Sequence, residues 1–170
     1  MKQSSFSFLK NYKKEFGGAL LLNKRKSKRP LSTKNPIHLV LKSCQTGLFS
    51  PGNRSLEKLI RLQAQKFNIR IYDLSLNWSH IHCVIKLQHK EDYIKFIRAL
   101  TSVMAQRILK IKPELGKIFR LRPYTRILSW GRDFKNALSY QIINQLEAWG
   151  FLKRHKKKSK SPKKSKKPPN

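Results

Sequence analysis

Two segments in the middle of the chain alternate apolar and polar residues with the period expected of a half-buried strand. Residues 69–76 follow this alternation, residues 77–79 form a polar turn, and a second extended run occupies residues 80–87. A period of two with a short turn between the runs predicts a β-hairpin. Residues 36–43 are mostly aliphatic or β-branched and lie between an Asn-Pro pair and a glycine, so they predict an earlier, buried strand.

Three other segments space their apolar residues three and four positions apart, as amphipathic helices do. The first follows a Pro-Gly turn and ends near Phe67, the second ends at Pro113, and the third covers residues 133–149 and stops at Gly150. For the first helix the predicted apolar face is Leu56, Leu59, Ile60, Gln63 and Phe67. For the second it is Ile94, Ile97, Thr101, Met104, Ile108 and Ile111.

The order strand, helix, strand, strand, helix is most of a ferredoxin-like βαββαβ unit. Residues 126–130 are the candidate for the missing last strand, and the helix of residues 133–149 follows them. We therefore predict an α+β fold with one antiparallel sheet, helices on one face, and an additional C-terminal helix.

The charge of the chain points to a polyanionic partner. Lys and Arg number 39 against 8 Asp and Glu, for a formal net charge of +31, while a hydrophobic content of 39% is enough for a core. We expect nucleic acid first and an anionic membrane surface second. No apolar run approaches the roughly 18 residues of a spanning helix, and residues 1–6 do not resemble a signal peptide. The expected location is the cytoplasm, in association with the nucleoid, with no membrane partner.

Composition divides the chain into three parts. Residues 1–34 form a basic N-terminal arm, residues 35–150 the folded domain, and residues 151–170 a Lys-rich tail with no apolar residues beyond its first two. Such a tail cannot bury a core and is predicted to be disordered. Its expected role is phosphate contact without sequence preference, and the alternative is a solubilising end.

His80 and His82 are the most informative pair in the sequence. Residues i and i+2 of a strand face one way, so both imidazoles project from one side of the sheet and can hold one metal ion. Two ligands do not complete a site, so a third donor must come from elsewhere in the fold. The alternative is that both are ordinary strand residues. His38 is a single histidine in the first strand, and we interpret it as a structural buried residue.

The last helix supplies the candidate third donor. Tyr140 and Asn144 lie one turn apart, on the side opposite the predicted core stripe. Asn144 can offer a carbonyl oxygen to a metal and Tyr140 its phenolic oxygen, while Gln145 is the second choice because it falls within the apolar stripe. The residues of that stripe are Phe134, Leu138, Ile142, Leu146 and Trp149.

The motif His80-Ile81-His82 with Tyr140 and Asn144 on a late helix resembles the HUH single-strand endonucleases, in particular the REP-associated tyrosine transposases. The resemblance runs from about Pro36 to Gly150. Members often carry Pro-Asn before the first histidine, where this chain has Trp-Ser, and often continue Asn-Pro-Val-Arg after the ligand. Here Gln-Leu-Glu-Ala follows instead, so the helix is predicted to run on for another turn.

The resemblance implies a metal-dependent transposase that nicks and rejoins single-stranded or hairpin DNA through a 5′-phosphotyrosine. Tyr140 would be the nucleophile, and His80, His82 and Asn144 would bind Mg²⁺ or Mn²⁺. Such enzymes act as monomers or as homodimers. Candidates for DNA contact, with a solvated basic loop as the alternative, are Arg120, Arg122, Arg126, Trp130, Arg132 and Lys135.

Two other functions compete with this one. A basic binder of DNA or structured RNA could keep the fold without the chemistry, and charge alone does not separate it from the enzyme. Hydrolysis by a metal-activated water is disfavoured, because no Asp or Glu lies within the motifs around His80 or Tyr140 to act as the base.

Overall fold

A computed structural model describes residues 14–24, 27–119 and 121–153, and it contains one five-stranded antiparallel sheet. The strand order is β1-β5-β2-β4-β3, and the four strands other than β1 follow the ferredoxin-like order. A β-hairpin joins β3 to β4, as the alternating pattern predicted. The strands are β1 (Glu15–Phe16), β2 (Ile37–Lys42), β3 (Ile69–Asn77), β4 (His80–Leu87) and β5 (Tyr124–Ile127).

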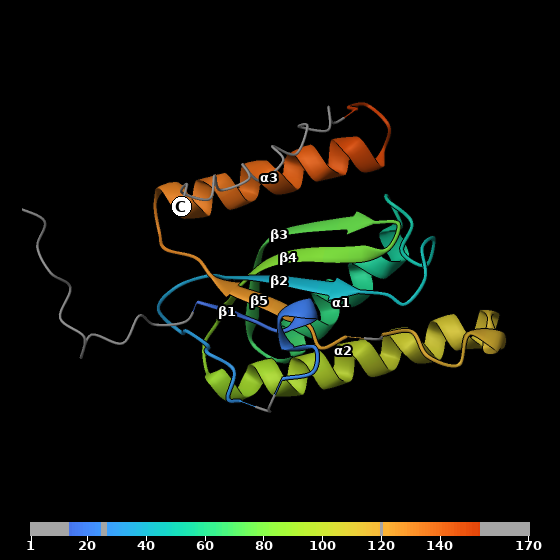
Figure 1. Cartoon of the computed structure of the whole chain (residues 1–170), viewed down its shortest axis with the longest axis horizontal. Helices are drawn as coiled ribbons and strands as arrows, with labels where there is room; N and C mark the ends of the chain where they lie inside the picture. The colour runs from blue at the N-terminus through green and yellow to red at the C-terminus, as the bar shows by residue number, and fades with distance from the viewer. Residues whose placement is uncertain (1–13, 25–26, 120, 154–170) are drawn as a thin grey trace, which may run out of the picture.

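The helices cover both faces of the sheet (Figure 1). Helices α1 (Arg54–Lys66) and α2 (Lys90–Ile111) pack on one face, and α3 (Arg132–Ala148) lies across the other, over β3 and β4. Two short 3-10 turns complete the described fold, η1 (Gly18–Leu21) and η2 (Pro113–Leu115). This confirms the predicted α+β class, with two helices on one face and the C-terminal helix added on the other.

The face under α1 and α2 carries the hydrophobic core. Alternate residues of β4 point into it, including the fully buried Ile81, Cys83 and Ile85, and Phe96 and Leu100 of α2 meet them. Complete burial of such side chains contributes about 1.5–3 kcal/mol each. Most of the fold's stability therefore comes from this face.

The face under α3 has a small apolar cluster and is otherwise polar. Val84, Leu128 and Ala137 form the cluster, and Tyr72 and Phe134 pack against it. Strand β3 contains a β-bulge between Ile71, which is opposite Ile85, and Asp73, which is opposite Val84, so Tyr72 is an additional residue on this face and Leu74 still points into the core. The bulge adds one residue to β3 without changing the pairing beyond it.

Two details of the predicted elements were wrong. The buried face of α2 is shifted, because Tyr93, Phe96, Leu100 and Met104 are buried while Ile94 and Ile111 are exposed. Strand β5 begins at Tyr124, two residues before the predicted start. In both segments several registers of apolar residues fit the local pattern equally well, and packing against the sheet selects one.

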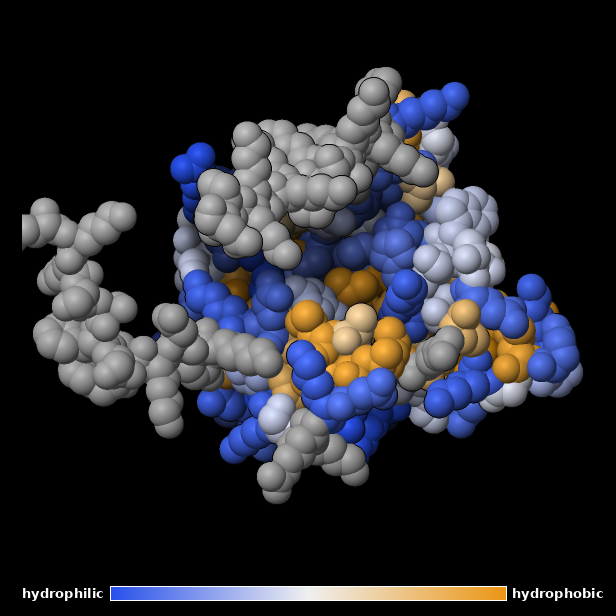
Figure 2. Space-filling view, viewed as in Figure 1, coloured by the Kyte–Doolittle hydropathy of each residue, from blue (hydrophilic) through white to orange (hydrophobic). Residues whose placement is uncertain are grey.

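The described part of the N-terminal arm packs on the domain. Strand β1 pairs with β5, and the Arg29 guanidinium donates hydrogen bonds to Thr125 Oγ1 (2.6 Å) and to the Pro123 carbonyl oxygen (2.9 Å). The same guanidinium lies 4.5 Å from the centre of the Phe16 ring. Figure 2 shows exposed apolar side chains gathered over η1, where Leu20 and Leu22 are exposed. The remaining residues of the arm and the tail beyond residue 153 lie outside the described residues.

In the portion of the chain that the structure describes, no helix combines the length and the apolar content needed to cross a membrane.

Candidate active site

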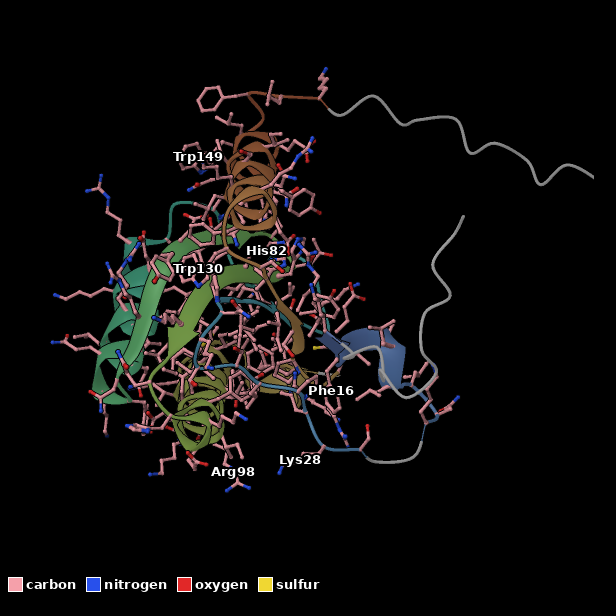
Figure 3. All side chains as sticks on the ribbon, turned by 90° about the vertical axis from the view of Figure 1, so that its left-hand side faces the viewer. Phe16, Lys28, His82, Arg98, Trp130 and Trp149 are labelled. Carbon is pink, nitrogen blue, oxygen red and sulfur yellow. The ribbon has the colours of Figure 1, made fainter. Side chains whose placement is uncertain are left out.

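The two β4 histidines project from one face of the sheet, as their spacing predicted, and α3 covers that face. His80 lies opposite Lys42 and Asn77, and His82 lies opposite Val40 and Ser75 in the neighbouring strands. Their ring centres are 4.7 Å apart, and Figure 3 shows His82 between the sheet and α3. The intervening Ile81 points into the core on the other face. The strand pleat alone therefore brings the two imidazoles together.

His38 joins them from β2 and is not an isolated structural histidine. Its Nε2 atom lies 3.0 Å from Nδ1 of His82, and the two rings stack at 5.2 Å with an interplanar angle of 9°. The Nδ1 atom of His80 is in turn 3.0 Å from the hydroxyl of Ser79. Each β4 histidine thus has a partner for its Nδ1 atom, which leaves the Nε2 atom as the one that could bind a ligand.

Burial and nearby cations keep the three imidazoles neutral. Burial, with Arg126 adding to it, lowers the pKa of His38 to about 4. Burial and then the two neighbouring histidines lower the pKa of His82 to about 3, while burial and Lys42 lower the pKa of His80. At neutral pH each ring therefore keeps one nitrogen lone pair, which is the form that binds metal.

Helix α3 brings Tyr140 to His82 and buries Asn144 one turn further along. The Tyr140 ring centre lies 6.1 Å from that of His82 in an edge-to-face arrangement, and the Tyr140 side chain is 44% exposed. Asn144 is only 8% exposed, whereas Gln145 is half-buried. Tyr140 and His82, which are distant in the sequence, thus lie side by side, and Asn144 is buried one turn further along α3.

The predicted core stripe of α3 was right for Phe134 and Leu138, which pack against the small apolar cluster, but wrong further along the helix. Ala137, Gln141 and Asn144 face the sheet, while Ile142 and Trp149 are exposed. The sheet surface beneath them carries histidines and other polar residues, so the helix presents small and polar side chains to it. Asn144 therefore lies on the sheet-facing side and not opposite it.

Both ends of α3 are fixed to the rest of the domain. At its start, Phe134 packs edge-to-face on Tyr72 at 5.3 Å and lies 5.1 Å from Trp130, whose indole N–H donates to the Lys34 carbonyl oxygen (2.9 Å). At its end, the Trp78 indole N–H donates to the Ala148 carbonyl oxygen (3.3 Å). The helix runs on to Ala148 as predicted. These contacts set the position of Tyr140 over the histidines.

Several buried polar atoms beneath α3 have no hydrogen-bond partner among the described residues. They include Ser75 Oγ, Asn77 Nδ2, His82 Nε2 and both amide atoms of Gln141, which is fully buried. An unpaired buried polar group costs about 1–3 kcal/mol, so such a cluster suits a site that receives a ligand. Sequence reasoning missed Gln141 and the contact of His38 with His82. The short spacing from Gln141 to Tyr140 and Asn144 was the available signal.

The donors fit a metal ion of mixed nitrogen and oxygen preference. Across the described ranges, no three His, Cys, Asp or Glu side chains form a group able to hold a metal, so an amide or phenolic oxygen has to complete the set. The unpartnered Nε2 of His82, the neighbouring His80 ring and the buried Asn144 amide meet that requirement.

The basic residues predicted to contact DNA have different surroundings. Arg126 is half-buried and forms an ion pair with Asp133 (3.1 Å), while Arg122, Arg132 and Lys135 are exposed. Trp130 is 46% exposed and belongs to the aromatic group at the start of α3. Arg120 lies outside the described residues.

Comparison with known proteins gives both a family and a fold. The sequence profile of a family described as "Transposase IS200 like" matches residues 33–136, which include His38, His80 and His82 and stop before Tyr140. No curated protein sequence matches the chain.

Among solved structures, a REP-associated tyrosine transposase bound to a REP hairpin is similar, with a TM-score of 0.58 and 14% identity over 75% of this chain and 76% of that one. A crystal structure from Deinococcus radiodurans R1, described as that of a transposase, has a TM-score of 0.44 and 19% identity over 71% of this chain and 98% of that one.

Proposed function

Since the chain belongs to the IS200-like transposase family, we propose that it cuts and rejoins single-stranded hairpin DNA through a covalent bond between Tyr140 and a 5′ phosphate. The observation that carries this proposal is the contact of the Tyr140 and His82 rings at 6.1 Å. The profile match ends before Tyr140, so this contact supports the nucleophile independently of the match. The exposure of the phenol leaves it accessible to a DNA backbone.

His80, His82 and Asn144 are the proposed metal ligands, with Mg²⁺ or Mn²⁺ as the ion. A bound divalent ion would neutralise charge on the phosphate and polarise a non-bridging oxygen. Mn²⁺ suits a set with two imidazoles better than Mg²⁺ does. The buried position of Asn144 favours it over the half-buried Gln145.

His38 is a positioning residue in this proposal. When the Nδ1–H of His82 donates to Nε2 of His38, Nε2 of His82 carries the lone pair that a ligand needs. The stacked His38 ring also fixes the orientation of the His82 ring. Ser79 plays the corresponding part for His80.

The chemical step exchanges one phosphodiester bond for another. The Tyr140 oxygen forms a bond to phosphorus and loses its proton, while the bond to the 3′ oxygen breaks and that oxygen takes up a proton. No water enters, so a second 3′-hydroxyl can attack the phosphotyrosine and restore a DNA strand. Strand joining requires such an exchange, because the phosphotyrosine bond remains available for a new 3′-hydroxyl, whereas hydrolysis would release the phosphate end.

Single-stranded or hairpin DNA is the proposed substrate. The net charge of +31 attracts phosphate, and Arg126 lies close to the histidines, where its charge adds to the lowering of the His38 pKa. The similar transposase of known structure was bound to a hairpin. A strand with unpaired nucleotides can bring its backbone to Tyr140 more readily than an intact duplex.

Adduct formation tests the proposal. The protein is incubated with Mn²⁺ and a labelled pool of single-stranded hairpins with randomised flanks, then run on a denaturing gel. We expect a slow DNA–protein band in the wild type and in a Tyr72→Phe control, and none in Tyr140→Phe. DNA binding with no adduct from the wild type would favour the non-catalytic binder, and cleavage unchanged in Tyr140→Phe would reject the tyrosine role.

A further inference from the structure

A cavity of about 370 Å³ opens beside Tyr140, on the side of the helix that faces β2 and β5. Its volume lies at the lower end of the range for small-ligand pockets, about 300–1,000 Å³, so it suits one nucleotide better than a longer segment. His82 lines it but the other two proposed ligands, His80 and Asn144, do not, so the cavity adjoins the proposed metal site through His82. Its wall includes His38, His82, Tyr124, Arg126, Asn136 and Tyr140.

Strand register explains why these side chains share one cavity. Tyr124 of β5 lies opposite Val40 of β2, which lies opposite His82 of β4, so the three form one row across the sheet. Arg126 lies opposite His38 in the next row on the same face. The row positions are set by backbone pairing, so the floor of the cavity is rigid.

The cavity combines an aromatic face, a cation and an amide. The Tyr124 ring meets His38 edge-to-face at 6.5 Å, which fixes its orientation. Arg126 is held by its ion pair with Asp133, whose other oxygen accepts from the Ser129 backbone N–H (2.9 Å). Asn136 is exposed at the rim, on the first turns of α3. A ring, a guanidinium and an amide are the groups that bind a base, a phosphate and a base edge respectively.

We propose that this cavity binds a single deoxynucleotide of the substrate strand, the one whose 5′ phosphate becomes joined to Tyr140. The base of this nucleotide lies against the Tyr124 ring, and the edge of the base meets the Asn136 amide. Arg126 contacts the phosphate of the nucleotide. The assignment rests on the proposed function, because that function places a phosphate at Tyr140.

The side of the cut follows from the geometry of displacement. In an in-line attack the departing 3′ oxygen leaves on the side of phosphorus opposite the Tyr140 oxygen. The nucleotide that keeps the phosphate is attached at an equatorial position and so stays next to the tyrosine. Because Tyr140 is itself a wall of the cavity, the downstream nucleotide is the one that the cavity can hold.

Binding of single nucleotides tests the cavity without any catalysis. Full-length ¹⁵N-labelled protein is titrated with deoxynucleoside 5′-monophosphates, the matching 3′-monophosphates and inorganic phosphate, and chemical shifts are followed. We expect the 5′-monophosphates to bind more tightly than the other two and to shift the β5 and α3 amides around Tyr124 and Asn136. Equal binding of 5′ and 3′ forms, or shifts confined to other surfaces, would overturn the assignment.

Variants separate base contact from general attraction to phosphate. Tyr124→Leu is expected to weaken 5′-monophosphate binding about tenfold through lost stacking, and Asn136→Ala to weaken it less and to level the preference among the four bases. Phosphate binding should not change in either variant. Gln106→Ala, which removes an exposed amide from α2, is the matched control. Asn136→Ala leaves the sheet intact, so its result stands even when Tyr124→Leu folds poorly.

Substrate cleavage then distinguishes a failure of the cavity from a failure of the proposed function. Once the cut position is mapped in the hairpin pool, an abasic analogue is placed immediately downstream or immediately upstream of it. The cavity predicts a rate loss of about tenfold for the downstream analogue only. If an adduct forms and both analogues react at equal rates, the nucleotide assignment of the cavity is wrong and the tyrosine chemistry stands. If 5′-monophosphates bind but no adduct forms, the cavity assignment stands and the proposed function is wrong.

Discussion

The two faces of the sheet are built from alternate residues of the same strands but serve different purposes. In β4, Ile81, Cys83 and Ile85 enter a closed apolar core under α1 and α2, while His80 and His82 face α3. The first face leaves few polar groups to satisfy. The second buries several that have no partner in the described chain, which lowers stability. Because the destabilising polar groups lie mainly on the α3 face, the apolar core under α1 and α2 can stabilise the whole fold.

The largest expected effect on the α3 face is on chemistry and not on folding. Tyr140→Phe should lower adduct formation by about a thousandfold or more, because the variant lacks the oxygen proposed as the nucleophile. The free energy of unfolding should change by no more than about 1 kcal/mol. Adduct yield and urea unfolding of the same preparation measure both. A large loss of stability would mean that Tyr140 is a structural residue.

On the core face the expectation is the opposite. Phe96 is fully buried, so Phe96→Ala should lower the free energy of unfolding by about 3–5 kcal/mol. That is a large share of the 5–15 kcal/mol typical of a domain. Urea unfolding measures the loss. Adduct formation per folded molecule should stay near the wild-type value at low temperature, and a specific loss of activity would show that the two faces are coupled.

His38 tests whether the α3 face positions its histidines. His38→Ala should weaken Mn²⁺ binding about 10–100-fold, because His82 loses the partner that orients its ring. Isothermal titration calorimetry without DNA gives the affinity. His89→Ala, which removes an exposed histidine next to the start of α2, is the control and should bind Mn²⁺ as the wild type does. Unchanged affinity in His38→Ala would reject the positioning role.

Gln141 measures the cost of polar burial on the α3 face. Gln141→Leu replaces a fully buried amide without a described partner by an apolar side chain of similar size. The free energy of unfolding should rise by about 1–2 kcal/mol in metal-free buffer. Chemical denaturation provides the value. A decrease would show that bound water or another partner satisfies the amide.

Tyr93 gives the smallest effect, on the core face. Burial raises its pKa to about 12, so the folded protein keeps this proton between pH 10 and 12 while the unfolded chain releases it. Stability therefore falls as pH rises through that window, and Tyr93→Phe should reduce the fall. At neutral pH the variant should be close to neutral in stability, and thermal unfolding at pH 7 and above pH 10 compares the two. An identical alkaline slope in wild type and variant would contradict this.

The sequence predicted the parts of the site that depend on local geometry. The shared side of His80 and His82 follows from the strand pleat, and the proximity of Tyr140 and Asn144 follows from one helical turn. The side of α3 that meets the sheet did not follow, because hydrophobic periodicity assumes an apolar surface below the helix and this one is polar. The contact of His38 with His82 depends on the pairing of β2 with β4, which no local pattern specifies.

The bulge in β3 has a consequence for how such a sheet can change. Tyr72 is an extra residue inserted into the strand, and it packs against Phe134 while Ile71 and Leu74 on either side of it contribute to the opposite layer. A shorter version of the strand lacking Tyr72 would still align Ser75 with His82 and Asn77 with His80. A change at the bulge can therefore alter how α3 is anchored to the sheet without shifting the alignment of the two histidines.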